Sequence, residues 1–227
     1  MDTRNDFRIL VAIDALERLK KMITGQRLHY PYNKHKAKQL LTQLHSLLMQ
    51  TRYSMLPANI LIQQDYVKEI KNKALELAKT ILPPKQQASQ IDRATLAELR
   101  YSLRILIGLP ARLLLGDENK PEYAIDIEAA KILSVHKHPN ADKLYLTRAQ
   151  ARYATHTIVT NIQDIKEGEI RAIAFLPPAI IRGELSEAMY CSDPLQGIKI
   201  GQRPPPDKLH LNELRAKIIQ ITKKYAQ

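Results

Sequence analysis

The sequence predicts an α+β multidomain protein: a helical bundle, then a small five-stranded β-barrel, then a C-terminal helix. Residues 1–120 carry four apolar stripes at helical spacing. Residues 121–203 carry short alternating runs between turn residues, and residues 204–227 begin with consecutive prolines and end in another amphipathic stripe. With 227 residues and 44% apolar content, the chain can bury two small cores. We therefore expect a basic helical domain, a barrel domain, and a spacer with a basic helix over these three ranges.

The N-terminal domain is predicted to be a four-helix bundle. Asn5 or Asp6 is placed to cap the first helix, and Gly25 to end it. Three further apolar stripes lie at 37–48, 67–81 and 96–106. Turn and breaker residues predict an end of the third helix at Pro83-Pro84, a loop or short linker at 85–90, and an end of the fourth helix near Gly108-Leu109-Pro110.

The segment between the first two helices interleaves aromatic and basic side chains. Tyrosine rings can stack on unpaired bases while Lys and Arg hold phosphates. The candidate RNA contacts of this segment are Arg27, Tyr30, Tyr32, Lys34, Lys36 and Lys38. The alternative is a packed Tyr-Pro-Tyr turn followed by a solvated helix start.

Residues 131–147 predict a β-hairpin. Two apolar, partly alternating runs flank a turn at 138–142, because Pro139 fixes its own φ and cannot donate to a strand ladder. Further strands are expected at 158–160 and 170–175, with a turn at 166–169. Short strands with closely spaced turns are typical of a small all-β barrel, and the OB-fold is such a barrel that binds nucleic acid.

Two blocks of this region identify a family: KILSVHKHPNADKLY at 131–145 and AFLPPAIIRGELSEAMYCS at 174–192. Together they resemble the tRNA-binding domain that occurs as an appendage of methionyl-tRNA synthetases and as a free-standing protein. The resemblance covers about residues 122–203 and implies an OB-fold that grips structured RNA, in the setting of translation. The residues in register with the family's His-Pro-x-Ala-Asp-Lys-Leu motif are Pro139, Ala141, Asp142, Lys143 and Leu144.

The second block keeps the family's scaffold residues but changes its polar ones. Phe175 stands where the family has Asn, and Pro177 and Ile180 stand where it has Lys. Since Lys and Asn hold phosphates and base edges, an OB-fold that serves another RNA surface or a protein contact competes with ordinary tRNA binding. Phe175 and Ile180 are expected to expose apolar surface on this face. The polar residues that remain, our candidate RNA contacts, are Lys143, Arg148, Arg182 and Ser186.

The positive charge is concentrated outside the barrel. Residues 1–123 hold 20 Lys and Arg against 12 Asp and Glu, residues 124–204 hold 10 against 9, and residues 205–227 hold 5 against 2, which accounts for the net charge of +12. Phosphate neutralisation supplies most non-specific RNA affinity, so we expect the two flanks to provide much of the electrostatic attachment.

Several classes of protein are not indicated by the sequence. The single cysteine, Cys191, excludes an internal disulfide and a thiolate zinc site. No phosphate-binding glycine loop, nucleophile elbow or metalloprotease motif occurs, and His136 and His138 lack a third ligand at a recognised spacing. We therefore expect no catalytic residues, no cofactor and no metal. Without a signal peptide or membrane-spanning stretch, a soluble cytoplasmic protein is expected.

These observations predict a non-enzymatic RNA-binding protein of the translation apparatus, and two functions remain open. One is a ribosome-bound or ribosomal component, whose partners are ribosomal RNA and ribosomal proteins. The other is a trans-acting carrier that presents tRNA to an aminoacyl-tRNA synthetase. For the C-terminal helix, the sequence leaves open packing on the bundle, formation of a homodimer, and contact with RNA.

Overall fold

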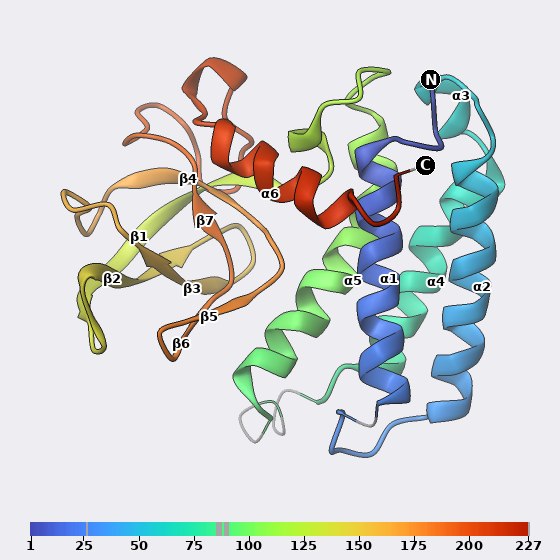
Figure 1. Ribbon diagram of the computed structural model, residues 1–227, viewed down its shortest axis with the longest axis horizontal. Coiled ribbons are helices and arrows are strands. Elements are labelled where there is room, and N and C mark those ends of the chain that lie inside the picture. The colour runs from blue at the N-terminus through green and yellow to red at the C-terminus, as the bar shows by residue number, and fades with distance from the viewer. Residues whose placement is uncertain (26, 85–87, 89–90, 227) are drawn as a thin grey trace. The chain divides into compact units, whose positions relative to one another are not determined.

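The computed structural model describes residues 1–25, 27–84, 88 and 91–226, and the chain divides into two compact units (Figure 1). Unit 1 comprises residues 1–125 and 215–227, and unit 2 comprises residues 126–214. The linker expected at 85–90 falls, apart from Ala88, outside the described residues.

Unit 1 contains a helical bundle, which confirms the predicted helical domain. Asp6 caps the first helix by accepting a hydrogen bond from the N–H of Arg8, and Gly25 follows its last residue, as predicted. Asn33 and Asp92 cap the helices that begin at Lys34 and Arg93 in the same way. No described helix is long and apolar enough to span a membrane. The helices are α1 (Phe7–Thr24), α2 (Lys34–Arg52), the short α3 (Ala58–Leu61), α4 (Asp65–Ile81) and α5 (Arg93–Leu113).

Helix α5 continues through Gly108-Leu109-Pro110, so the predicted end at these residues is wrong. Pro110 lacks the N–H that would bond to the preceding turn, which is why the sequence suggested a stop. However, the buried Arg112 guanidinium packs against this turn and donates a hydrogen bond to the carbonyl of Ile105. A Cβ on Gly108 would lie 2.5 Å from Arg112 Nη1, so the glycine makes room for this side chain within the helix.

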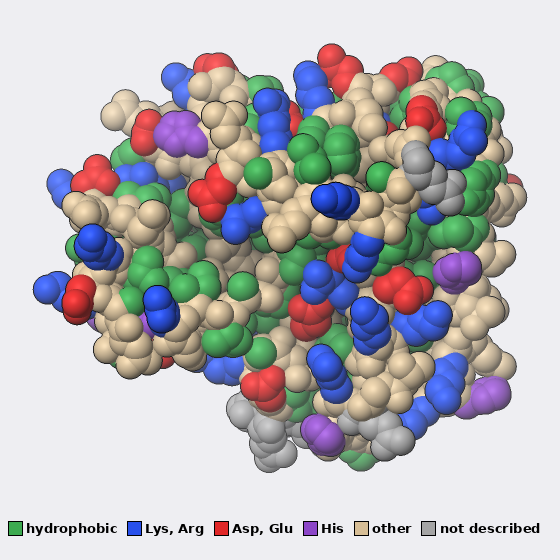
Figure 2. Space-filling view, viewed as in Figure 1, with side chains coloured by type: hydrophobic (Ala, Val, Ile, Leu, Met, Phe, Trp, Pro, Cys, Tyr) green, Lys and Arg blue, Asp and Glu red, His purple; other side chains and the backbone are tan. Residues whose placement is uncertain are grey.

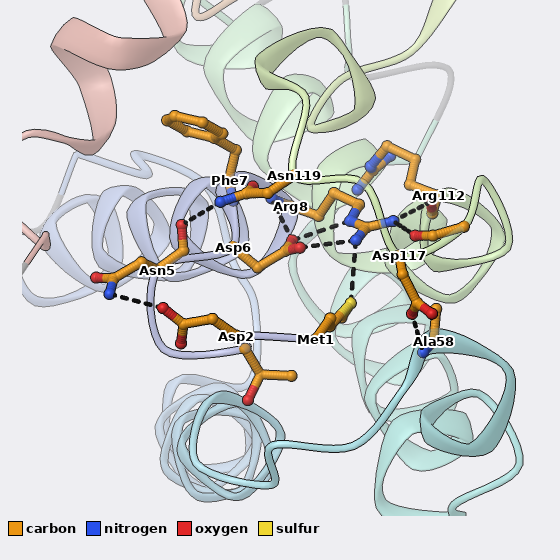
Figure 3. A network of polar contacts seen from close by, with 12 residues as sticks. Met1, Asp2, Asn5, Asp6, Phe7, Arg8, Ala58, Arg112, Asp117 and Asn119 are labelled. Carbon is orange, nitrogen blue, oxygen red and sulfur yellow. Dashed lines mark hydrogen bonds and ion pairs between the residues drawn. The ribbon is translucent and has the colours of Figure 1, made fainter.

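A network of polar contacts joins the start of the chain to the segment after α5 (Figure 3). Arg8 donates to both carboxylate oxygens of Asp6, at 2.9 and 2.7 Å. Asn119 Oδ1 accepts a hydrogen bond from the first N–H of α1 at 2.9 Å, and Asp117 Oδ1 accepts one from the first N–H of α3 at 2.6 Å. The segment after α5 therefore satisfies donors at the starts of two helices.

The chain returns to unit 1 at its C-terminus, where α6 (Asn212–Thr222) is the predicted C-terminal helix. Arg215 forms a bidentate ion pair with Glu122, which lies in the short 3-10 helix Pro121–Tyr123. Lys224 lies 2.7 Å from the buried carboxylate of Asp14 on α1. Of the three arrangements left open by the sequence, the structure therefore shows this segment packed on the bundle.

Unit 2 contains a five-stranded antiparallel sheet in the order β3-β2-β1-β4-β7 and a separate β5-β6 hairpin. Its inner face buries the apolar residues that alternate along the strands, among them Ile132, Ile158 and Ile173. The helical domain, this sheet and α6 confirm the predicted fold class; closure of the sheet into a barrel stays a prediction. The strands are β1 (Ile127–His138), β2 (Ala141–Gln150), β3 (Thr155–Thr160), β4 (Ile170–Ala174), β5 (Ala179–Ile181), β6 (Glu184–Ser186) and β7 (Met189–Tyr190).

Candidate nucleic-acid interface

Two hairpin turns of unit 2 are held together by hydrogen bonds. His138, at the end of β1, accepts a hydrogen bond at Nδ1 from the N–H of Asn140, so Nε2 carries the ring proton and donates it to the carbonyl of Ile181 at 3.1 Å. Asn140 Nδ2 donates to the carbonyl of Arg182, also at 3.1 Å. The β1–β2 turn and the β5–β6 turn are therefore bonded to each other, and the His138 ring makes one of these bonds.

Arg182 lies at the tip of the β5–β6 hairpin in an unfavourable backbone conformation. Its φ is +51° and that of Gly183 is +96°, and these two residues form the whole loop between the paired Ile181 and Glu184. Positive φ at both central residues is the type I′ hairpin geometry, in which Asn or Gly is usual. An arginine there costs about 1–2 kcal/mol relative to an ordinary conformation. Arg182 thus combines backbone strain with an exposed charge, the combination from which a functional role can be hypothesised.

Lys143 and Arg148 place further positive charge along β2. Lys143 follows the turn that is tied to Arg182, and Arg148 lies opposite Ser134 of β1 and Thr157 of β3. All three cations are exposed, and among the described residues none has a carboxylate oxygen within 4.0 Å. Such cations remain available for phosphate groups. Of the four candidates in this unit, the structure thus places Lys143 just after a turn that is bonded to the turn of Arg182, and Arg148 further along β2.

Ser186 does not share this accessibility. Ser186 is only 6% exposed. Its hydroxyl accepts a hydrogen bond from the N–H of Val159 and donates one to the carbonyl of Ala188. Ser186 therefore links β6 to β3, and its buried hydroxyl is not placed to contact RNA.

Phe175 and Ile180, the two apolar residues at positions where the family has polar ones, differ in solvent exposure. Ile180 is 59% exposed, as expected, but Phe175 is only 4% exposed, so the expectation that it adds surface is wrong. Phe175 follows β4 on the same side as Ile173, two residues earlier, which turns its ring into the core. There the ring meets that of His156 edge to face, with centroids 4.9 Å apart.

In unit 1, the tyrosines before α2 are packed. The Tyr30 hydroxyl donates to the carbonyl of Ile81 at 2.6 Å, and its ring centroid lies 6.0 Å from that of Tyr32. Burial raises the pKa of Tyr30 to about 12 and also raises the pKa of Tyr32. The packed Tyr-Pro-Tyr turn is the arrangement observed, and it leaves these rings poorly placed for base stacking.

The cations of this segment remain near the start of α2. Lys36 forms an ion pair with Glu76 of α4 at 2.9 Å, whereas Arg27, Lys34 and Lys38 are exposed and have no carboxylate oxygen within 4.0 Å among the described residues. Elsewhere in unit 1 positive charge is often neutralised locally, and Figure 2 shows Lys and Arg interspersed with Asp and Glu over α1. The charge count of the N-terminal flank therefore overstates what is available to RNA.

One exposed aromatic residue of unit 2 was not predicted from the sequence as a candidate RNA contact. Tyr153, in the β2–β3 turn, is 84% exposed. The neighbouring Arg152 holds its guanidinium 5.8 Å from the ring centroid. In the sequence, this site was signalled by an Arg-Tyr pair between two strand-like runs.

The described residues contain no group of three or more His, Cys, Asp or Glu arranged to hold a metal ion.

Comparison with known proteins assigns both parts of the chain. The family model "Alpha helical domain" matches residues 1–116, and the family model "Putative tRNA binding domain" matches residues 127–211. The chain belongs to the alpha helical domain family and carries a tRNA-binding domain. This confirms the family resemblance found in the β region.

Individual relatives match only part of the chain. The phenylalanine–tRNA ligase beta subunit of Syntrophus aciditrophicus is 32% identical over 109 residues, which cover 42% of this chain and 14% of the relative. Among solved structures, the C-terminal domain of Plasmodium vivax p43 matches with 17% identity and a TM-score of 0.32, covering 40% of this chain and 76% of its own. A methionyl-tRNA synthetase related protein from Pyrococcus horikoshii matches with 20% identity and a TM-score of 0.30, covering 38% and 85%.

Proposed function

We propose that this protein is a non-enzymatic, cytoplasmic tRNA-binding protein of translation, which holds tRNA on its tRNA-binding domain and presents it to an aminoacyl-tRNA synthetase. One observation carries the proposal: Lys143, near the start of β2, and Arg182, at the tip of the β5–β6 hairpin, are exposed and have no carboxylate partner among the described residues, and hydrogen bonds join the two turns beside them. Because the turns beside these cations are joined, the backbone that carries them needs little rearrangement when the side chains bind the phosphates of a structured RNA.

The helical unit would contribute a second, weaker contact. Lys34 is the first residue of α2, where the helix dipole adds positive potential, Lys38 lies about one turn later, and Arg27 lies in the segment before the helix. Cations on two units that are both attached to one RNA raise the effective concentration of each contact. The charge of the helical unit thereby supports the tRNA-binding domain.

Filter binding of unfractionated tRNA to the full chain tests the proposal. We expect the double change Lys143→Ala and Arg182→Ala to weaken binding and to lower the slope of log affinity against log salt by about 2, because each lost phosphate contact removes about 0.9. Lys208→Ala, which also removes an exposed cation of unit 2, is the matched control and should have a smaller effect. Equal affinities of the double variant and the control would reject this RNA-binding surface.

The partner is tested separately by sedimentation of the native protein from a cell extract. The proposal expects the protein in light fractions together with tRNA and synthetase. Salt-stable sedimentation with a ribosomal subunit would contradict it and support the ribosomal alternative. Formation of aminoacyl-tRNA by the purified chain, supplied with tRNA, amino acids and ATP, would contradict the non-enzymatic part.

A further inference from the structure

The β2–β3 hairpin ends in a tight turn that presents an aromatic ring to solvent. The N–H of Ala151 bonds to the carbonyl of Ala154 at 2.9 Å, which leaves Arg152 and Tyr153 as the two tip residues. Tyr153 is the most exposed of the large apolar and aromatic side chains in the described part of the chain. Because a tyrosine side chain has only two χ angles and the bonded turn holds its backbone, little conformational freedom is lost when a ligand stacks on the ring.

Arg152 is fixed beside this ring by a neighbouring turn. Its Nη2 donates to the carbonyl of Gly201 at 2.9 Å. A Cβ on Gly201 would lie 2.6 Å from Arg152 Cβ and 2.8 Å from its Nε, and the φ of +82° at this glycine suits no other residue well. The turn itself is anchored to β1, since the N–H of Gly201 bonds to the carbonyl of Ala129 at 2.8 Å. The guanidinium is therefore positioned by backbone geometry as well as by the ring.

Further cations surround the tip. Lys199 belongs to the turn that carries Gly201, and Lys131 of β1 lies opposite Gln150, the last residue of β2. Both lysines are exposed and have no carboxylate oxygen within 4.0 Å among the described residues. A ring flanked by cations is the arrangement with which proteins bind unpaired nucleotides, the ring stacking on the base and the cations holding the phosphates.

We propose that Arg152 and Tyr153 form a stacking site for an unpaired base of the bound RNA. The site is at the opposite end of β2 from the turn that precedes Lys143, so it is separate from the phosphate contacts of the proposed function. The proposal rests on that function, because it assumes that RNA binds this domain. It adds a contact that distinguishes RNA with unpaired nucleotides from a continuous duplex.

The helical unit supplies a matched control with the same dipeptide. The Arg52 guanidinium lies 5.6 Å from the Tyr53 ring centroid, and Tyr53 is 52% exposed. Arg52, however, is buried and donates to the carbonyls of Arg4 and Tyr225. This pair thus serves the packing of unit 1, and we expect no RNA contact from its ring.

Affinity measurements on the full chain test the stacking site. We expect Tyr153→Ala to weaken tRNA binding roughly 5- to 150-fold, the range found when a base-stacking aromatic is removed. The salt slope should stay unchanged, because no phosphate contact is lost. Tyr153→Phe should retain the affinity within about twofold, and Tyr53→Ala should leave it unchanged. For a fully paired RNA duplex, Tyr153→Ala should have no effect.

Fluorescence gives a second readout, because the chain contains no tryptophan. Tyr153→Trp introduces a single reporter, whose emission we expect tRNA to quench through stacking, whereas Tyr53→Trp should not respond. If wild-type protein binds tRNA while Tyr153→Ala binds equally well and the Trp at 153 is not quenched, the stacking site is wrong and the proposed function stands. If wild-type protein does not bind tRNA, the proposed function itself fails.

Discussion

The loop before α2 and the tip of the β2–β3 hairpin have similar compositions and different structures. Both combine tyrosine with basic residues. In the loop, the Tyr30 hydroxyl finds a backbone carbonyl at the end of α4 and its ring packs near Tyr32. At the hairpin tip, Tyr153 has Arg152 beside its ring and remains exposed to solvent. An aromatic residue among cations is therefore available to RNA only where the fold offers its ring no packing partner.

The largest expected effect concerns a ring that is fully packed within the tRNA-binding domain. Phe175→Asn should lower the free energy of unfolding of unit 2 by about 3–5 kcal/mol, because it leaves a cavity and buries an amide. Tyr153→Asn, at the exposed tip, should change it by less than about 0.5 kcal/mol. Urea denaturation followed by circular dichroism measures both, and similar losses from the two variants would contradict the contrast in burial.

The contrast between Phe175 and Tyr153 also shows what the sequence could predict. The caps at Asp6 and Gly25 were predictable, since capping depends on neighbours in sequence. The inward position of Phe175 was signalled by its spacing from Ile173, but the comparison with the family pattern obscured it. The resemblance correctly identified the domain.

Other features depend on contacts between distant segments. Helix α5 continues past Pro110, Gly108 makes room for the Arg112 side chain, and the starts of α1 and α3 are capped by residues after α5. The burial of Ser186 follows from its bonds to β3, and the exposure of Tyr153 follows from the absence of packing neighbours. Composition and periodicity carry no record of these contacts, so local reasoning missed them.

A second prediction uses pH to separate buried from exposed phenols. Burial raises the pKa of Tyr190, which shares a hydrogen bond with Thr147, to about 12. Its neutral form is favoured by folding, so the corresponding stability is present below pH ~10 and is lost as the pH rises toward ~12, by up to about 3 kcal/mol. Urea midpoints between pH 8 and 12 should fall less steeply for Tyr190→Phe than for wild type. Tyr153→Phe is the control; an equal change in that variant would oppose the prediction.

A smaller effect is expected in the loop before α2. Tyr30→Phe keeps the ring and removes the hydroxyl that binds the Ile81 carbonyl, which should cost about 1 kcal/mol of unit 1 stability. Because the packed ring is not a stacking site, tRNA affinity should be unchanged even for Tyr30→Leu, once the variant is shown to be folded. A loss of tRNA affinity in folded Tyr30→Leu comparable to that of Tyr153→Ala would reverse the assignment of the two regions.

The last prediction has the opposite sign and concerns the strained tip of the β5–β6 hairpin. Arg182→Gly removes a positive φ from a residue with a Cβ, which favours folding by about 1–2 kcal/mol, but glycine loses about 0.5–1 kcal/mol more backbone freedom. The net gain should be at most about 1.5 kcal/mol, visible as a raised urea midpoint.

The same variant should bind tRNA more weakly, with a salt slope lower by about 0.9, because it loses one phosphate contact. Arg182→Lys, which keeps the charge and the strain, should show neither the gain in stability nor the full loss of affinity. A variant that becomes more stable while its RNA affinity falls would show that Arg182 is retained for binding at the expense of the fold; unchanged affinity in Arg182→Gly would remove this residue from the interface.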